Sequence, residues 1–267
     1  MKQNNTAIIH PSARIGCGVE VGPYAVIEAD VEIGDNCVIG PHALIHSYTK
    51  LGSGCRIHAN AVLGDTPQDT SFKECRSFVE IGKNCVLREG VTIHRGTEKD
   101  SKTLVGDNCF LMGYSHIAHN CIVGNRVIMA NGALLAGRVE LGDGVFMSGN
   151  ASVHQFVKIG SLAMLSGSSG ATKDVPPFCT LHGFALNQVS GLNVIGMRRA
   201  GMPPEDRKAV KRVFRKIYTS GLNVSQALSE LAGEELPAPA AEFVDFVKNS
   251  KRGICRFHNT KIEKSEK

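Results

Sequence analysis

The sequence contains no apolar run close to the ~18 residues that a membrane-spanning helix needs. Its first fifteen residues also lack the charged start and apolar core that are typical of a secretory signal. A chain of 267 residues with 42% hydrophobic and 21% charged residues has the composition of a globular protein and is long enough to bury a core. We therefore expect a cytoplasmic protein with no membrane span.

Paired metal-binding cysteines are missing as well. None of the nine cysteines belongs to a C-x-x-C pair or takes the cysteine–histidine spacing of a zinc site. Five of them occupy one slot of the repeat described below, which elsewhere holds alanine or valine: Cys37, Cys55, Cys85, Cys109 and Cys121. A thiol in such a slot behaves as a small buried hydrophobe. We expect neither disulfides nor a metal site from these residues.

The net charge of +5 is modest, and no recognised nucleic-acid-reading motif accompanies it. The positive residues are nevertheless concentrated in one stretch, opposed locally only by Glu205 and Asp206. The members of this cluster are Arg198, Arg199, Arg207, Lys208, Lys211, Arg212, Arg215 and Lys216. An acidic protein or a phosphorylated ligand fits such a patch as well as nucleic acid does.

What the sequence has in abundance is a period of six. From Ile9 to Ala171, 24 of 28 positions spaced six apart carry Ile, Leu, Val or Met, and the exceptions are Asp69, Cys75, Lys99 and Ala171 itself. Neither a helix with a period of 3.6 nor an alternating strand with a period of 2 produces this pattern. A hexapeptide β-helix does, because three short strands close one coil and each aliphatic residue points into the prism. The period predicts a mainly β fold, a parallel β-helix.

Glycine directly after an aliphatic residue marks one corner of each coil. The pairs Ile15-Gly16 and Ile33-Gly34 are 18 residues apart, which is the length of a full coil. Ile81-Gly82 comes 30 residues after the preceding pair and 24 before the next, so two coils are longer by 12 and by 6 residues. We expect this extra chain to leave the prism as loops near residues 66–77 and 96–102. Long loops on a rigid scaffold are where binding groups tend to lie.

The repeat stops at Val175-Pro176-Pro177, since proline cannot continue regular strand pairing. Further on, Pro203-Pro204 starts a helical pattern that Gly221 ends, and two shorter helical patterns follow at 223–231 and 240–248. The prediction is a β-helix domain over residues 1–190 and a small α-helical C-terminal domain over residues 191–267. The second domain can cover the open edges at the end of the β-helix.

Histidines supply the candidate chemistry. His116 and His119 lie in the stretch YSHIAHN, and His154 stands after Val153 where glycine is usual. His119 takes an outward-facing place on its coil, and an imidazole titrates near neutral pH, as a general base must. Five others are expected at surface or corner positions: His10, His42, His46, His58 and His94.

A metal site is the competing interpretation, because hexapeptide prisms also host zinc hydratases. The gamma carbonic anhydrases use three histidines, two of them in an H-x4-H arrangement. Here His116 and His119 form H-x2-H, and no third ligand is evident from spacing. We expect no metal and no other cofactor.

Six segments resemble the UDP-N-acetylglucosamine O-acyltransferase family that begins lipid A synthesis. They are Gln68-Asp69, Ile93-His94-Arg95-Gly96, His116-Ile117-Ala118-His119-Asn120, Leu135-Ala136-Gly137, Val153-His154-Gln155-Phe156 and Asp174-Val175-Pro176-Pro177. The resemblance runs in order over nearly the whole chain. It implies a homotrimer of left-handed β-helices with active sites between subunits. It also implies transfer of a 3-hydroxyacyl chain from acyl carrier protein to the 3-hydroxyl of UDP-N-acetylglucosamine.

The resemblance assigns roles to individual residues. His119 matches the family's general base, and the backbone N–H of Gly137 matches the donor that stabilises the oxyanion. Gly167 matches the position that measures acyl length. The substrate-contacting positions correspond to Gln68, Asp69, His116, Arg138, His154, Gln155, Asn193 and Arg199, with Arg198 as an alternative to Arg199. The basic helices are expected to face the acidic acyl carrier protein.

Three departures from the family pattern concern the substrate. Ser71 stands where the family has lysine, although Lys73 is only two residues away. Arg138 replaces a histidine, and Ile195 replaces a glutamate near Asn193. These changes leave open a modified acceptor such as a 3-amino UDP-sugar, in which case an amide forms. They also leave open a non-catalytic binding homologue.

Overall fold

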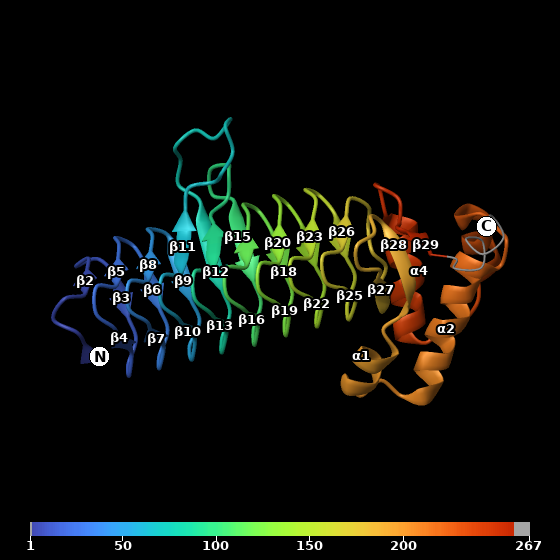
Figure 1. Ribbon diagram of the computed structural model, residues 1–267, viewed down its shortest axis with the longest axis horizontal. Helices are drawn as coiled ribbons and strands as arrows, with labels where there is room; N and C mark the ends of the chain where they lie inside the picture. Colours follow the sequence, from blue (N-terminus) through green and yellow to red (C-terminus); the bar gives the residue numbers. More distant parts are fainter. Residues whose placement is uncertain (1, 259–267) are drawn as a thin grey trace.

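The computed structural model describes residues 2–258 and shows a long β-helical rod with helices packed at its C-terminal end (Figure 1). The chain passes in turn through three sheets, here called A, B and C, which form the faces of the rod and whose strands pair in parallel except for β27 with β28. Sheet A has 12 strands, sheet B has 9 and sheet C has 8. Most strands are only two residues long, because the chain turns a corner after each.

The strands of sheet A are β1 (Lys2–Gln3), β4 (Glu20–Val21), β7 (Val38–Ile39), β10 (Arg56–Ile57), β13 (Val86–Leu87), β16 (Phe110–Leu111), β19 (Ile128–Met129), β22 (Phe146–Met147), β25 (Met164–Leu165), β27 (Cys179–Leu181), β28 (Gln188–Leu192) and β29 (Arg256–Phe257). Those of sheet B are β2 (Ile8–Ile9), β5 (Val26–Ile27), β8 (Leu44–Ile45), β11 (Val62–Asp65), β14 (Thr92–His94), β17 (His116–Ile117), β20 (Leu134–Leu135), β23 (Ser152–Val153) and β26 (Gly170–Ala171). Those of sheet C are β3 (Arg14–Ile15), β6 (Glu32–Ile33), β9 (Thr49–Leu51), β12 (Phe78–Ile81), β15 (Lys102–Val105), β18 (Ile122–Val123), β21 (Glu140–Leu141) and β24 (Lys158–Ile159).

The strand register follows the sequence period. Paired residues are 18 apart in the regular coils, as in Phe110 with Ile128. The separation rises to 30 for Arg56 with Val86 and to 24 for Val86 with Phe110. The additional residues leave the rod as two loops: the first excursion loop, residues 66–77 between β11 and β12, and the second excursion loop, residues 95–101 between β14 and β15. Both loops rise from the same edge of the rod (Figure 1).

The aliphatic residues of the sixfold pattern form the core of the rod. From Val21 to Leu165 each of them is at most 4% exposed. Burying such a side chain contributes about 1.5–3 kcal/mol relative to leaving it in water. Ile9 and Ile15 are only partly buried, because too few coils precede them to cover their side chains. The core is therefore a continuous apolar column along the rod.

The corner glycines are required by close stacking of the coils. Gly34 lies outside the left-handed φ region, and a Cβ there would lie 2.6 Å from the backbone nitrogen of Ser53 in the next coil. Many left-handed corner positions are instead taken by side chains that can adopt positive φ, such as Asn36 and Asn120. The cysteine slot agrees with its predicted role: all five thiols are free and buried, and Cys109 donates to the Gly124 carbonyl oxygen at 3.2 Å.

Four helices follow the rod: α1 (Val194–Arg199), α2 (Pro204–Thr219), α3 (Val224–Leu231) and α4 (Ala238–Asn249). The three helices predicted from the sequence correspond to α2, α3 and α4. Each starts as its sequence suggests, with proline at the start of α2 and α4 and an Asn223 capping box at α3. Helix α1 and the strands β28 and β29 were not predicted.

The end of the rod is closed by this C-terminal region. Strand β28 pairs antiparallel with β27, and β29 then adds to β28, so the last edge of sheet A is covered. Asp174 links the rod to the C-terminal region. Its carboxylate accepts hydrogen bonds from the Lys158 backbone N–H of the rod, at 2.9 Å, and from the Ser250 hydroxyl that follows α4, at 2.6 Å. No helix among residues 2–258 is long and apolar enough to cross a membrane.

Candidate functional site

The candidate site lies along the edge of the rod where sheet B meets sheet C. His119, Gly137 and Gln155 are 18 residues apart and follow β17, β20 and β23 at equivalent corners. Backbone hydrogen bonds hold these corners together: Arg138 N–H donates to the His119 carbonyl oxygen at 2.9 Å, and Phe156 N–H donates to that of Gly137 at 3.1 Å. The predicted base and the predicted oxyanion donor are therefore neighbours in successive coils.

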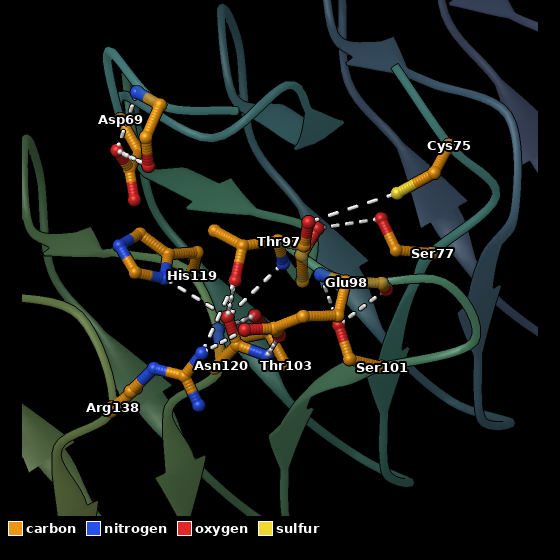
Figure 2. A network of polar contacts seen from close by, with 12 residues as sticks. Asp69, Cys75, Ser77, Thr97, Glu98, Ser101, Thr103, His119, Asn120 and Arg138 are labelled. Carbon is orange, nitrogen blue, oxygen red and sulfur yellow. Dashed lines mark hydrogen bonds and ion pairs between the residues drawn. The ribbon is translucent and has the colours of Figure 1, made fainter. Parts of the chain in front are cut away.

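The tautomer of His119 is defined by Asn120 (Figure 2). The side-chain oxygen of Asn120 accepts the backbone N–H of Thr97 at 3.1 Å, which identifies it as oxygen, since a backbone N–H can only donate. The Nδ1 atom of His119 lies 2.9 Å from the same oxygen and must therefore carry the proton. The Nε2 atom is then left with a free lone pair. A half-buried imidazole in this tautomer can accept a proton from a ligand.

Gly137 allows the His119 ring to take this place. A Cβ at Gly137 would lie 2.4 Å from both Cε1 and Nε2 of the ring, well inside contact distance. Within residues 2–258 the N–H of Gly137 donates to no protein acceptor. The glycine therefore packs against the His119 ring and has a backbone N–H that is free to bind a ligand. This combination is what an acyl-transfer site needs, a base next to a donor for the developing oxyanion.

The second excursion loop lies against these corners. Glu98 accepts a hydrogen bond from the Asn120 side-chain nitrogen at 3.3 Å and forms an ion pair with Arg138. Arg138 also stacks over Phe156, with its guanidinium carbon 5.8 Å from the ring centroid. Figure 2 shows Thr97, Glu98, Asn120 and Arg138 as one connected network beneath His119.

The first excursion loop brings Asp69 above His119 (Figure 2). Its carboxylate accepts the N–H and the hydroxyl of Ser71 at 2.9 and 2.7 Å. These hydrogen bonds, with smaller contributions from His119 and Arg138, hold the pKa of Asp69 below its usual value. Ser71 therefore holds the Asp69 carboxylate through two hydrogen bonds, whereas the nearby Lys73 side chain is exposed. Gln68 is exposed on the same loop.

His116 is half-buried on sheet B, where its Nδ1 atom lies 2.7 Å from the Thr92 hydroxyl. His94, expected at a surface or corner position, lies at the end of β14 where the chain turns, but it is buried and not at the surface. His94 is 5% exposed and packs edge-on against His116, with ring centroids 5.1 Å apart. Burial, together with the neighbouring rings of His94 and His119, lowers the pKa of His116 to about 4. Burial lowers the pKa of His94 as well, so His94 and His116 are both neutral near pH 7.

The remaining predicted residues are distributed along the rod. His154 and Gln155 are exposed on the same edge as His119, two coils further along. Gly167 lies at the corner between sheets A and B, where a Cβ would meet only the Gly149 carbonyl oxygen at 3.7 Å. A side chain at Gly167 would therefore project into open space.

Helix α1 lies apart from this cluster, at the C-terminal end of the rod and away from the excursion loops (Figure 1). Asn193 caps it by accepting the Gly196 N–H at 2.9 Å and also donates to the Leu162 carbonyl oxygen at 2.8 Å. Arg198 and Arg199 are exposed in its last turn, and Ile195 is 63% exposed at its start. One chain does not bring these residues next to His119.

Thr97 and Glu98 were not singled out by sequence reasoning. Asn120 was part of the quoted motif, and its place next to His119 was the signal that it could hold the ring. No such signal exists for Thr97 and Glu98, because their loop breaks the repeat. Among the described residues, no three His, Cys, Asp or Glu side chains are grouped so that they could hold a metal ion.

Comparisons with known proteins agree with this picture. The family model described as "Udp N-acetylglucosamine O-acyltransferase; Domain 2" matches residues 174–255, and a model of bacterial transferase hexapeptides matches residues 12–47 and 102–137. The chain is 47% identical over 253 residues to an acyl-[acyl-carrier-protein]–UDP-N-acetylglucosamine O-acyltransferase of Neisseria meningitidis serogroup B, covering 94% of this chain and 98% of the relative. The similarly named protein of Paraburkholderia phymatum is 41% identical over 257 residues, again covering 94% and 98%.

Solved structures show the same relation. A UDP-N-acetylglucosamine acyltransferase from Bacteroides fragilis superposes with a TM-score of 0.91 at 39% identity, covering 95% of this chain and 99% of that one. A corresponding structure from Acinetobacter baumannii has a TM-score of 0.89 at 37% identity, with 96% and 100% covered. These likenesses confirm the predicted left-handed parallel β-helix with a helical C-terminal region.

Proposed function

Because the chain belongs to the acyl-[acyl-carrier-protein]–UDP-N-acetylglucosamine O-acyltransferase family, we propose that it catalyses the reaction for which that family is named. It is an acyltransferase that moves a 3-hydroxyacyl chain from acyl carrier protein to the 3-hydroxyl of UDP-N-acetylglucosamine. This is the first step of lipid A synthesis, and we assign it to the cytoplasm. The observation that carries the proposal is the His119 ring lying on Gly137 with its Nδ1 proton donated to Asn120.

The proposed reaction proceeds by direct attack. His119 Nε2 takes the proton of the sugar hydroxyl while the oxygen forms a bond to the thioester carbonyl carbon. The Gly137 N–H donates to the resulting oxyanion, an interaction worth ~3 kcal/mol in comparable acyl transfers. The tetrahedral intermediate then collapses, the carbon–sulfur bond breaks, and the imidazolium returns its proton to the thiolate. General-base catalysis of this kind contributes about 10²–10⁴-fold.

The acceptor is proposed to bind across two subunits of a homotrimer. Four residues lie along the edge that carries His119 and would contact the sugar: Gln68, Asp69, His154 and Gln155. His116, on the adjoining face of sheet B, would contact it as well. Arg198 and Arg199 of the partner subunit, beside its Asn193, would grip the diphosphate, because a planar guanidinium can bind phosphate oxygens with two hydrogen bonds. Support comes from the separation, within one chain, of α1 from the excursion loops that lie against the His119 corner (Figure 1).

Acyl carrier protein is proposed to dock on α2. Two of the basic residues of this helix are already paired, Arg212 with Glu234 and Lys216 with Glu230. Lys208, Lys211 and Arg215 are exposed at spacings of three and four, so they form one stripe, and within residues 2–258 none has an ion-pair partner. An acidic carrier protein complements such a stripe.

The test is transfer by purified protein, with mass spectrometry of the products from a panel of UDP-sugars and 3-hydroxyacyl carrier proteins. We expect an ester of UDP-N-acetylglucosamine and loss of at least about 100-fold in kcat for His119→Ala. An amide product would instead identify a 3-amino sugar as the acceptor. Absence of any product across sugars and chain lengths would identify a binding homologue, and a fully active His119→Ala variant would exclude the mechanism.

A further inference from the structure

The orientation of one amide decides whether His119 can act as a base. The oxygen and nitrogen of an asparagine side chain exchange places when the amide rotates by half a turn. In one orientation the oxygen of Asn120 faces Nδ1 of His119 and requires a proton there. In the other orientation the amide nitrogen faces Nδ1, which must then accept, so the proton moves to Nε2. A ring of that second tautomer has no lone pair to offer the acceptor hydroxyl.

Two adjacent residues, Thr97 and Glu98, hold the amide in the first orientation. The Thr97 backbone N–H donates to the amide oxygen at 3.1 Å, and the Thr97 hydroxyl lies 2.8 Å from the same atom. On the other side of the amide, the nitrogen donates to Oε2 of Glu98 at 3.3 Å. An ionised carboxylate can only accept, so Glu98 discriminates between the two ends of the amide as firmly as a backbone N–H does.

Glu98 is itself held by three further interactions. Its second carboxylate oxygen, Oε1, receives a hydrogen bond from Arg138, whose nitrogen also lies 3.4 Å from the Thr97 hydroxyl. Its backbone N–H and carbonyl oxygen both bind the Ser101 hydroxyl, at 3.0 and 2.7 Å. Partial burial alone would raise the pKa of Glu98, but the hydrogen bond from Thr97 and the charge of Arg138 keep the pKa below its usual value. The carboxylate is therefore ionised at neutral pH.

An ion pair as exposed as Glu98–Arg138, at 56% and 38% of the two side chains, contributes little to folding stability. Its placement matters more than its strength, because it ties the tip of the second excursion loop to the coil that follows His119. The connected path runs from Arg138 through Glu98 to the Asn120 amide and ends at Nδ1 of His119 (Figure 2).

We propose that Glu98, held by Arg138, is a positioning residue that keeps the Asn120 amide in the orientation that leaves Nε2 of His119 unprotonated. The catalytic part of this inference rests on the proposed role of His119 as general base, whereas the tautomer it predicts is a property of the free protein. Arg138, which replaces the histidine usual in the family, then acts through Glu98.

The test compares two isosteric variants in the same loop. Glu98→Gln replaces the acceptor-only group by an amide that can also donate, so the Asn120 amide is no longer held from its nitrogen side and only Thr97 opposes its rotation. Asp100→Asn is the matched control, because Asp100 binds Arg76 at 3.0 and 2.7 Å and does not contact Asn120. For both we would record the ¹⁵N chemical shifts of the His119 ring, with His119→Ala for assignment, together with kcat and both KM values.

For Glu98→Gln we expect ring shifts that move towards the Nε2-protonated tautomer. We also expect a fall in kcat of at least about tenfold with KM changed less than about twofold, since a wrong tautomer alone costs ~10⁴-fold in a serine protease triad. Asp100→Asn should leave all of these unchanged. Unchanged ring shifts in Glu98→Gln would overturn the inference. A shifted tautomer with undiminished transfer would support the positioning role and instead refute His119 as the base.

A second background separates orientation from a general loss of structure. Asn120→Asp puts a carboxylate next to Nδ1, which accepts the proton whichever oxygen faces it, so the orientation of this group no longer matters. Its second oxygen then faces the Glu98 carboxylate, and Glu98→Gln removes the repulsion between the two charges. In the Asn120→Asp background we therefore expect Glu98→Gln neither to lower kcat nor to shift the ring towards the Nε2-protonated tautomer. If Glu98→Gln lowers kcat equally in both backgrounds, Glu98 acts by another route and the inference is wrong.

Discussion

Gly137→Ala should separate catalysis from stability. The new methyl carbon would lie 2.4 Å from Cε1 and Nε2 of His119, whereas non-bonded carbon atoms rest at about 3.5 Å, so the ring must move by about 1 Å. A misplacement of that size costs about 100-fold in rate, or about 2.7 kcal/mol of transition-state stabilisation. Gly137 lies outside the left-handed φ region, so alanine introduces no backbone strain and reduces the entropy of the unfolded chain.

The assay is steady-state transfer from 3-hydroxyacyl carrier protein together with thermal unfolding. We expect kcat to fall by about 100-fold while Tm stays within a few degrees of that of the unmodified protein. Gly149→Ala is the control, since a Cβ there meets only the Asn131 carbonyl oxygen, at 3.6 Å. If folded Gly137→Ala keeps more than about a tenth of its activity, the ring does not lie over Gly137 in the working enzyme and the reasoning fails.

Three further predictions follow from burial, open space and charge. Because the pKa of His116 is about 4 in the folded protein and about 6.5 when unfolded, its contribution to stability is complete above pH 6.5 and is lost as the pH falls towards 4. His116→Gln should therefore flatten the dependence of urea unfolding on pH in that window, and an unchanged slope would contradict the burial argument. Gly167→Met fills open space and should shift products of mixed acyl donors to shorter chains, as read by mass spectrometry, without lowering Tm. Lys211→Glu with Arg215→Glu should raise KM for acyl carrier protein about tenfold at low salt and progressively less at high salt, whereas Lys83→Glu on the rod should not.

The rod could be predicted from the sequence because an aliphatic residue at every sixth position forms its core. Each coil buries its aliphatic residues in the same way, so the period alone identifies strands, corners and core. The same spacing places His119, Gly137 and Gln155 at one edge, 18 residues apart. Helix α2 was predictable for a similar reason, since Val210, Val213, Phe214 and Ile217 are buried at helical spacing.

The rest depends on contacts that no period encodes. Strands β28 and β29 exist only because the end of sheet A offers a free edge, and their sequences carry no strand signal of their own. His94 occupies a corner slot that is normally exposed, yet it is buried where the first excursion loop leaves the rod and against the ring of His116. Glu98 belongs to the site only because its loop folds back onto Arg138 and Asn120, and no sequence pattern predicts that contact.

The departures at Ser71 and Arg138 bear on the same question, which is where the positive charge for a diphosphate comes from. The lysine that the family pattern has in place of Ser71 would offer a cation near His119. Ser71 carries no charge, and its N–H and hydroxyl both donate hydrogen bonds to Asp69. Arg138 adds a permanent cation to this edge, but its charge is neutralised by Glu98. Among the described residues in contact with His119 or Asn120, no unpaired cation therefore remains. The charge for the diphosphate must come from residues further away, such as the exposed Lys73 on the first excursion loop or the arginines of α1. Arg198 and Arg199 are exposed, yet they lie on α1, away from His119 in the same chain. If Arg198 and Arg199 supply that charge, as proposed above, they come from α1 of a second copy, and we then expect transfer to depend on assembly.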